Sequence, residues 1–304
     1  MASGFCLEHF GQRKEDGHSR RHSRPFFLLK ENEYQPFLCA AYMSDPFSIL
    51  RECIAEYTRF NAARSLSCGQ PSEFQLHRFG EAIAMLDPER PGSWMYNRVL
   101  GFCENSVPQV RDIFALYKKA GEPCRFDIDA DKLFPEVIEP LVKRGLGATK
   151  ALTYFSAKPK MPKANLRRTG VAFERWEPDR ADDFLELLKS SGVICEPEVW
   201  KDRREYYCTD TFRTVVASCD GHPCSWATMF VDGEYGYLAN AYTMPEFRNR
   251  GCHSVLLRAR MADAKELGLQ RIFTDVIGDS QSHQNCKRAG FKDLTVMTLW
   301  ADEC

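Results

Sequence analysis

The sequence of 304 residues has no uninterrupted apolar run long enough to span a bilayer, which excludes a helical membrane span. It also has no surplus of either charge, since 41 basic and 42 acidic residues leave a formal net charge of −1. Proteins that bind nucleic acid usually carry a basic surplus, so we expect neither a nucleic-acid partner nor a membrane partner. Any site for an anion must therefore be local.

No two cysteines have the CxxC spacing, although the chain contains 13 cysteines. Disulfide frameworks of secreted proteins are short and cysteine-dense, whereas these cysteines are scattered and odd in number. Cys219 and Cys224 flank an expected turn, but no other Cys or His lies at zinc-ligand spacing from them. We therefore expect reduced, buried thiols in a cytoplasmic protein, and no metal site.

The chain length suits two domains rather than one. Residues 1–42 are largely polar and contain acidic residues that a mitochondrial presequence would lack, so we expect a flexible N-terminal extension. The basic, proline-containing segment 158–163 has the composition of a linker. It divides the rest into a first domain, residues 43–160, and a second domain, residues 161–304.

The first domain is expected to alternate between helices and strands. Asp45 is a candidate N-cap for a helix that begins at Pro46, a favourable residue for a first turn. Further helices are expected at 107–120 and 134–144, and strands at 94–102, 124–128 and 148–157.

The second domain repeats this alternation more fully. Helices are expected at 179–191, from the turn near 251 to Gly268, and at 283–289, with strands at 171–176, 212–218, 225–231, 235–243, 271–276 and 294–300. The two halves share an order of strand, helix, short strand, helix, glycine and strand. We therefore expect a mixed α/β protein with tandem folds, each a mostly antiparallel sheet flanked by helices.

The turn between the strand at 235–243 and the next helix has the composition of an anion site. It reads Arg248-Asn249-Arg250-Gly251 and follows Pro245. The first N–H groups of a helix lack intrahelical acceptors, and the helix dipole favours negative charge there. The first half has 105–109 in the corresponding place, without the arginines or the glycine, so only the second half is expected to bind phosphates well.

Three motifs in order make residues 212–300 resemble the GCN5-related N-acetyltransferase family, called GNAT. The family's turn, Q/R-x-x-G-x-G/A, is matched at 248–251, while His253 stands where a small residue is usual. The segment 243–245 is similar to the family's V-x-P strand end. Residues 282–291 are similar to its S-x-x-N-x-x-x-x-G-F segment. The first half resembles the family only in the order of its elements.

The resemblance implies a site for acetyl-CoA as co-substrate. The pyrophosphate would lie on N–H groups at the start of the helix, and the pantetheine along the splayed end of the preceding strand. A backbone N–H of that strand would polarise the thioester carbonyl. The residues expected to bind acetyl-CoA are Ala241, Tyr242, Thr243, Arg248, Asn249, Arg250, Gly251, Cys252, His253, Ser254 and Asn285.

Catalysis needs a group that takes a proton from the amine and a group that protonates the leaving thiolate. Many family members have a tyrosine four residues before the Gly-Phe pair, where this chain has Cys286. Tyr242 and Asn240 share one face of the strand on which members often carry the base. These three are the candidate catalytic residues, and a role in core packing is the alternative for each.

The resemblance favours transfer of an acetyl group to an amine of a small-molecule acceptor through a ternary complex, by a monomer or a homodimer. A non-catalytic acyl-CoA-binding or regulatory interaction module is the alternative, because the tyrosine is missing and His253 is unusual. Acyl or aminoacyl transfer by a related tandem fold is a third interpretation. The near-neutral charge gives no support for a tRNA partner.

Overall fold

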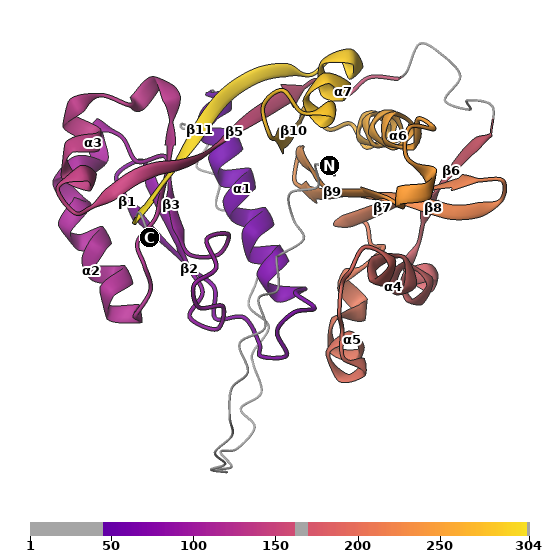
Figure 1. Cartoon of the computed structure of the whole chain (residues 1–304), viewed down its shortest axis with the longest axis horizontal. Coiled ribbons are helices and arrows are strands. Elements are labelled where there is room, and N and C mark those ends of the chain that lie inside the picture. Colours follow the sequence, from indigo (N-terminus) through magenta and orange to yellow (C-terminus); the bar gives the residue numbers. More distant parts are fainter. Residues whose placement is uncertain (1–44, 162–169, 303–304) are drawn as a thin grey trace.

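The computed structural model describes residues 45–161 and 170–302 (Figure 1). The described strands are β1 (Gln75–Phe79), β2 (Ala82–Leu86), β3 (Arg98–Leu100), β4 (Phe126–Asp129), β5 (Leu146–Ala157), β6 (Val171–Trp176), β7 (Phe212–Cys219), β8 (His222–Asp232), β9 (Tyr235–Thr243), β10 (Arg271–Val276) and β11 (Lys292–Asp302). The described α-helices are α1 (Pro46–Ala63), α2 (Val110–Ala120), α3 (Pro135–Val142), α4 (Ala181–Ser190), α5 (Pro197–Arg203), α6 (Cys252–Glu266) and α7 (Gln281–Ala289). None of the described helices has the length and apolar character that a membrane span needs.

The described strands form one sheet in the order β1-β2-β3-β4-β11-β5-β10-β9-β8-β7-β6. Most neighbours are antiparallel, and the parallel pairs are β3 with β4 and β9 with β10. The expected mixed α/β architecture, with a mostly antiparallel sheet flanked by helices, is confirmed.

The two halves of the chain exchange their last strands within this sheet. Strand β5 of the first half lies between β10 and β11 of the second half, with Tyr154 opposite Asp275. Strand β11 pairs in turn with β4, where Thr298 lies opposite Ile128. The sequence did not predict this exchange, because alternation along a strand identifies its buried face but not its partner.

Helices cover both faces of the sheet, and Figure 1 shows α6 and α7 on one side of the second half and α4 and α5 on the other. Successive residues of β9 point to opposite faces of the sheet and pack in different cores. Tyr237 packs in the cluster that contains residues of α1 and α4, whereas Leu238 packs against α6. Helices α2 and α3 cover a further cluster on β2, β3 and β4. The face that α1 covers is called the α1 face below.

Helix α1 begins as its sequence predicts. The Asp45 carboxylate accepts a hydrogen bond from the Ser48 N–H at 3.1 Å, and Pro46 occupies the first turn. Helix α2 ends at Gly121, whose φ of 74° is left-handed.

In the first half, one local prediction was wrong and one hairpin was not predicted. Residues 94–97, expected to be a strand, form a turn in which the Asn97 side chain bonds to the backbone of Asp87 and Arg90, so that only 98–100 are extended. The hairpin of β1 and β2 was missed because every residue of β2 is buried, which removes the period-two pattern from its sequence.

The exchange of strands predicts that the halves do not fold independently. Residues 161–304 produced alone are expected to form no stable monomer, because β10 and β11 lose the strand that joins them and expose unpaired edges. Size-exclusion chromatography and denaturant unfolding test this, and co-production with residues 1–160 is expected to restore a soluble complex. A monomeric 161–304 fragment that unfolds cooperatively would contradict the prediction.

Candidate active site

The loop between β9 and α6 has the backbone of an anion site. Asn249 and Gly251 have left-handed φ angles of 65° and 91°. Gly251 is the N-cap of α6, and no side chain caps the helix. The N–H groups of 252–254 therefore lack both intrahelical acceptors and a side-chain acceptor. Successive N–H groups in such a turn form a concave site for anions.

The two arginines of the loop are exposed and partly engaged by the protein. The Arg248 Nε donates a hydrogen bond to the Thr243 carbonyl at 3.2 Å. Arg250 lies 3.6 Å from the Asp220 carboxylate, with its guanidinium 5.2 Å from the ring centre of Phe247. Each guanidinium has five N–H donors, so both retain donors for a ligand beside the loop.

The structure brings His253 and Asn285 together, two residues that separate motifs had predicted for cofactor binding. The Asn285 Nδ2 and the His253 Nδ1 lie 3.0 Å apart. Burial and the nearby Arg260 cation lower the pKa of His253 to about 4, so its ring is neutral at pH 7. His253 therefore orients Asn285 and adds no charge for a phosphate.

A small polar pocket lies between α6 and α7 beside this pair. Its volume is about 140 Å³, and two of the residues predicted for the cofactor, Ser254 and Asn285, line it. The remaining lining residues are Leu257, Arg258, Arg288 and Ala289. The two arginines add positive charge near the uncapped end of α6, a contribution that the sequence motifs did not identify.

Strand β9 separates from β10 after the third of its nine residues. The last parallel pair joins Tyr237 to Phe273, although β9 continues to Thr243. On its other edge β9 stays paired with β8, but the register shifts between Ala227 and Met229, which marks a β-bulge. A bulge bends its strand, so the residues beyond it turn away from β10. Among the described residues, the peptide groups of 239–243 thus have no strand partner on the β10 side.

A buried cation lies behind the bulge. The Arg260 side chain is 2% exposed, and its Nη1 donates a hydrogen bond to the Thr228 carbonyl at 2.9 Å. No carboxylate of the described residues forms an ion pair with it. Burial lowers the pKa of Arg260 to about 10, so it remains charged at neutral pH. A positive charge therefore lies at the register shift between β8 and β9.

The predicted catalytic residues do not gather at one point. The Tyr242 hydroxyl donates a hydrogen bond to the Ser190 carbonyl at the end of α4, at 3.1 Å, and Asn240 is partly buried. Cys286 is buried on the opposite face, in the core that α6 and α7 cover, and burial raises the pKa of its thiol to about 11. The position of Cys286 favours a packing role.

A buried polar network that the sequence did not predict lies on the α1 face. The Tyr237 hydroxyl donates a hydrogen bond to Asp275, two residues beyond the last β9–β10 pair. Arg98 forms an ion pair with Asp127 at 2.8 Å. Burial raises the pKa of Asp275, although the bond from Tyr237 and the Arg98 charge favour its ionised form. These groups come from β3, β4, β9 and β10, so no local motif could have identified them.

A cavity of about 220 Å³ adjoins this network. Asp127, a member of the network, and Tyr154, which lies opposite Asp275, line the cavity. Residues from both halves of the chain complete its walls. The other lining residues include Trp94, Lys150, Ile277 and Met297. A largely apolar cavity with a few convergent polar groups is the usual form of a small-molecule site.

Comparisons with known proteins relate part of the sequence to one family and the fold to solved structures. Residues 181–291 match the family model described as Acetyltransferase (GNAT) family. The GCN5-related N-acetyltransferase from Kribbella flavida is similar in structure, with a TM-score of 0.58 and 13% identity over 83% of this chain and 96% of that one. No curated protein matches the chain.

Two further solved structures have similar folds. The GCN5-related N-acetyltransferase from Sphaerobacter thermophilus gives a TM-score of 0.53 at 12% identity, over 82% of this chain and 92% of its own. A conserved protein of unknown function from Staphylococcus epidermidis gives 0.54 at 13% identity, over 77% and 95%. The matched segment 181–291 contains the loop at 248–251, the open end of β9 and α7. This part of the chain is a domain of the GNAT family.

Proposed function

We propose that this protein transfers the acetyl group of acetyl-CoA to an amine of a small-molecule acceptor, by direct transfer in a ternary complex. The proposal depends on the uncapped loop at Gly251 and on the neighbouring end of β9, which is paired with β8 but open on the side toward β10. We further expect a cytoplasmic monomer or homodimer without a nucleic-acid partner.

The residues at this place fit acetyl-CoA. Two phosphates need several N–H donors and positive charge, which the N–H groups of 252–254 and the arginines at 258 and 288 supply. The pantetheine arm carries amides, which can pair with the free edge of β9 at 241–243 in the manner of an added strand. The thioester would then lie at the bulge, between β9 and β10.

The chemistry at the thioester follows from the groups around the bulge. As the amine nitrogen bonds to the carbonyl carbon, negative charge develops on the carbonyl oxygen, and the C–S bond then breaks. A backbone N–H near Tyr242 and the buried Arg260 cation stabilise that charge because both are fixed before the reaction. The thiolate must gain a proton, for which the Tyr242 hydroxyl is the remaining predicted donor, since Cys286 is buried in the core on the opposite face.

The proton of the attacking amine needs an acceptor on the α1 face. We propose Asp275, since its carboxylate lies just beyond the point where β9 and β10 separate. A raised pKa brings a carboxylate closer to the range in which it serves as a general base. Tyr237 holds the carboxylate in place and is a positioning residue.

The cavity on the α1 face is the proposed site of the acceptor. The Asp127 carboxylate is already paired with Arg98 at 2.8 Å, so an ammonium group of the acceptor would share it with that guanidinium. Arg98 and Lys150 also lie over the Trp94 ring, 4.9 and 5.5 Å from its centre, so this ring contributes an apolar wall to the cavity. The remaining walls are mostly apolar, from side chains such as Ile277 and Met297. A volume of about 220 Å³ favours a small amine with an apolar part.

A non-catalytic acyl-CoA-binding module is the second candidate. Its support is Cys286, which replaces the tyrosine expected from the family motif and lies in the core at 3% exposure. Such a module would keep the loop and the open strand without a proton donor at this position.

Calorimetry with acetyl-CoA, together with a thiol-release assay over a panel of small aliphatic and aromatic amines, separates the two candidates. The enzyme is expected to bind acetyl-CoA and to release CoA only when an amine is present. Binding without turnover on any amine would favour the module, and the absence of binding would contradict both.

The variant Gly251→Ala tests the loop. A side chain at this left-handed position strains the turn and fills the space where the phosphates would approach, so acetyl-CoA affinity is expected to fall at least about 10-fold, or about 1.4 kcal/mol. The matched control is Gly268→Ala, near the other end of α6, where φ is 75° and an added Cβ meets nothing within 4 Å among the described residues. Calorimetry on both folded variants is the measurement, and equal affinities would show that the loop is not the phosphate site.

The variant Asp275→Asn tests the proposed base. It is expected to lower kcat by about 10²- to 10⁴-fold with little change in acetyl-CoA affinity. In the unaltered protein kcat/KM should fall as the pH falls through the raised pKa of Asp275, and the Asn variant should lose this acid limb. Tyr237→Phe removes a bond that favours the ionised carboxylate, so its acid limb should move to higher pH. An acid limb that persists in Asp275→Asn would assign the base elsewhere.

A further inference from the structure

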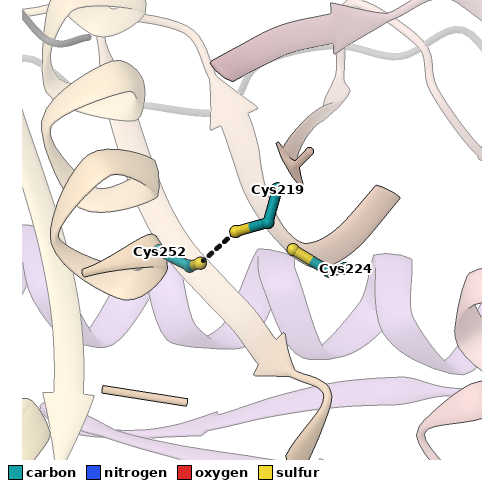
Figure 2. A group of neighbouring side chains, drawn as sticks. All are labelled: Cys219, Cys224 and Cys252. Carbon is teal, nitrogen blue, oxygen red and sulfur yellow. Dashed lines mark hydrogen bonds between the residues drawn. The ribbon is translucent and has the colours of Figure 1, made fainter. Parts of the chain in front are cut away.

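Three cysteines converge between the β7–β8 hairpin and the start of α6. Cys219 ends β7, Cys224 lies in β8, and Cys252 is the first residue of α6 (Figure 2). Their sulfur atoms all lie within 4.8 Å of one another, and those of Cys219 and Cys252 are 3.7 Å apart. Among the residues that the structure describes, no other group of three potential metal ligands is as close.

Two separate turns produce this convergence. Asp220 and Gly221, both with left-handed φ angles, reverse the chain so that Cys219 and Cys224 come close together. The loop at 248–251 then places the first turn of α6 over the same hairpin. The sequence predicts no metal site here, because Cys252 follows Cys224 by 28 positions, outside the usual spacings between zinc ligands.

The cluster is enclosed by apolar side chains. The three cysteines are 1%, 0% and 2% exposed, and they pack with Val171, Ala217 and Val255. Their polar neighbours are the backbone carbonyls of residues 217 and 247, which accept weak bonds from Cys224 and Cys252. Burial explains each cysteine as a small apolar residue, but it does not require three sulfur atoms to face one another.

We propose that Cys219, Cys224 and Cys252 form a three-sulfur site for a soft monovalent metal ion, with copper(I) as the fitting first-row ion. Metal–sulfur bonds of about 2.3 Å in a trigonal arrangement place sulfur atoms about 4.0 Å apart, within the range that the cluster spans. Sulfur-only ligand sets select copper(I), zinc or iron–sulfur clusters.

The number of ligands distinguishes these ions. Structural zinc sites and iron–sulfur clusters use four protein ligands, and the described residues add no fourth sulfur, nitrogen or carboxylate ligand to the cluster. Zinc sites with three protein ligands keep an open fourth position for water, whereas these cysteines are at most 2% exposed. Copper(I) accepts three sulfur ligands. On binding, each thiol that becomes a ligand releases its proton to solvent, its sulfur lone pair forms the bond to the ion, and no electron is transferred.

A bound ion would connect the hairpin to the first turn of α6, directly after Gly251. The site itself does not depend on acetyl-CoA, so it can be tested without any enzymatic assay. Cys219 and Cys224 are the informative positions, because neither belongs to the proposed acetyl-CoA site.

The full chain, fully reduced and kept free of oxygen, is titrated with copper(I) in competition with the chromophoric chelator bicinchoninate. Mutating a residue that only supports a metal ligand lowers metal affinity about 10- to 100-fold. Because Cys219→Ala and Cys224→Ala each remove a ligand itself, each should lower the copper(I) affinity at least about 100-fold. Cys53→Ala is the matched control, since Cys53 is 3% exposed in α1, away from the cluster, and the affinity should be unchanged. X-ray absorption should show three sulfur neighbours at about 2.3 Å.

Thermal unfolding of each variant comes first, and a serine substitution replaces any alanine variant that does not fold. Equal copper(I) affinity in the unaltered protein and both test variants would overturn the proposal. So would displacement of copper(I) by an equal concentration of zinc(II).

Discussion

The pairing of β5 with both β10 and β11 is the constraint on which the rest of the structure depends. It joins the halves into one sheet and places Tyr154, from the first half, opposite Asp275, from the second. The cavity and the polar network on the α1 face draw their residues from both halves for this reason. The proposed acceptor site therefore exists only when the strands are exchanged, whereas the loop at Gly251 lies wholly within the second half.

The features that the sequence predicted are local ones. The N-cap at Asp45, the turn at 248–251 and the helix end at Gly290 each depend on a few neighbouring residues whose conformational preferences are strong. The anion-binding character of the loop follows from the same preferences, since glycine tolerates the left-handed backbone and the start of a helix leaves N–H groups without acceptors.

The features that the sequence did not predict depend on contacts between distant segments. Asp275 looks like an ordinary strand residue until the fold places Tyr237 and Arg98 near it. Cys252 lacks a metal-ligand spacing until α6 returns over the β7–β8 hairpin. The hairpin at 75–86 was missed for a different reason, since a fully buried strand has no polar alternation. The proposed cofactor side of the site is formed by neighbouring residues and was predicted from the sequence. The proposed acceptor side draws residues from both halves and was not.

The central claim is that acetyl-CoA lies with its phosphates on the loop before α6 and its pantetheine along the open end of β9. A crystal structure of the protein with CoA tests this most directly. The account predicts phosphate oxygens within hydrogen-bond distance of the N–H groups of 252–254, and pantetheine amides paired with the backbone of 241–243. CoA bound elsewhere, with the edge of β9 toward β10 still open beyond Tyr237, would contradict it.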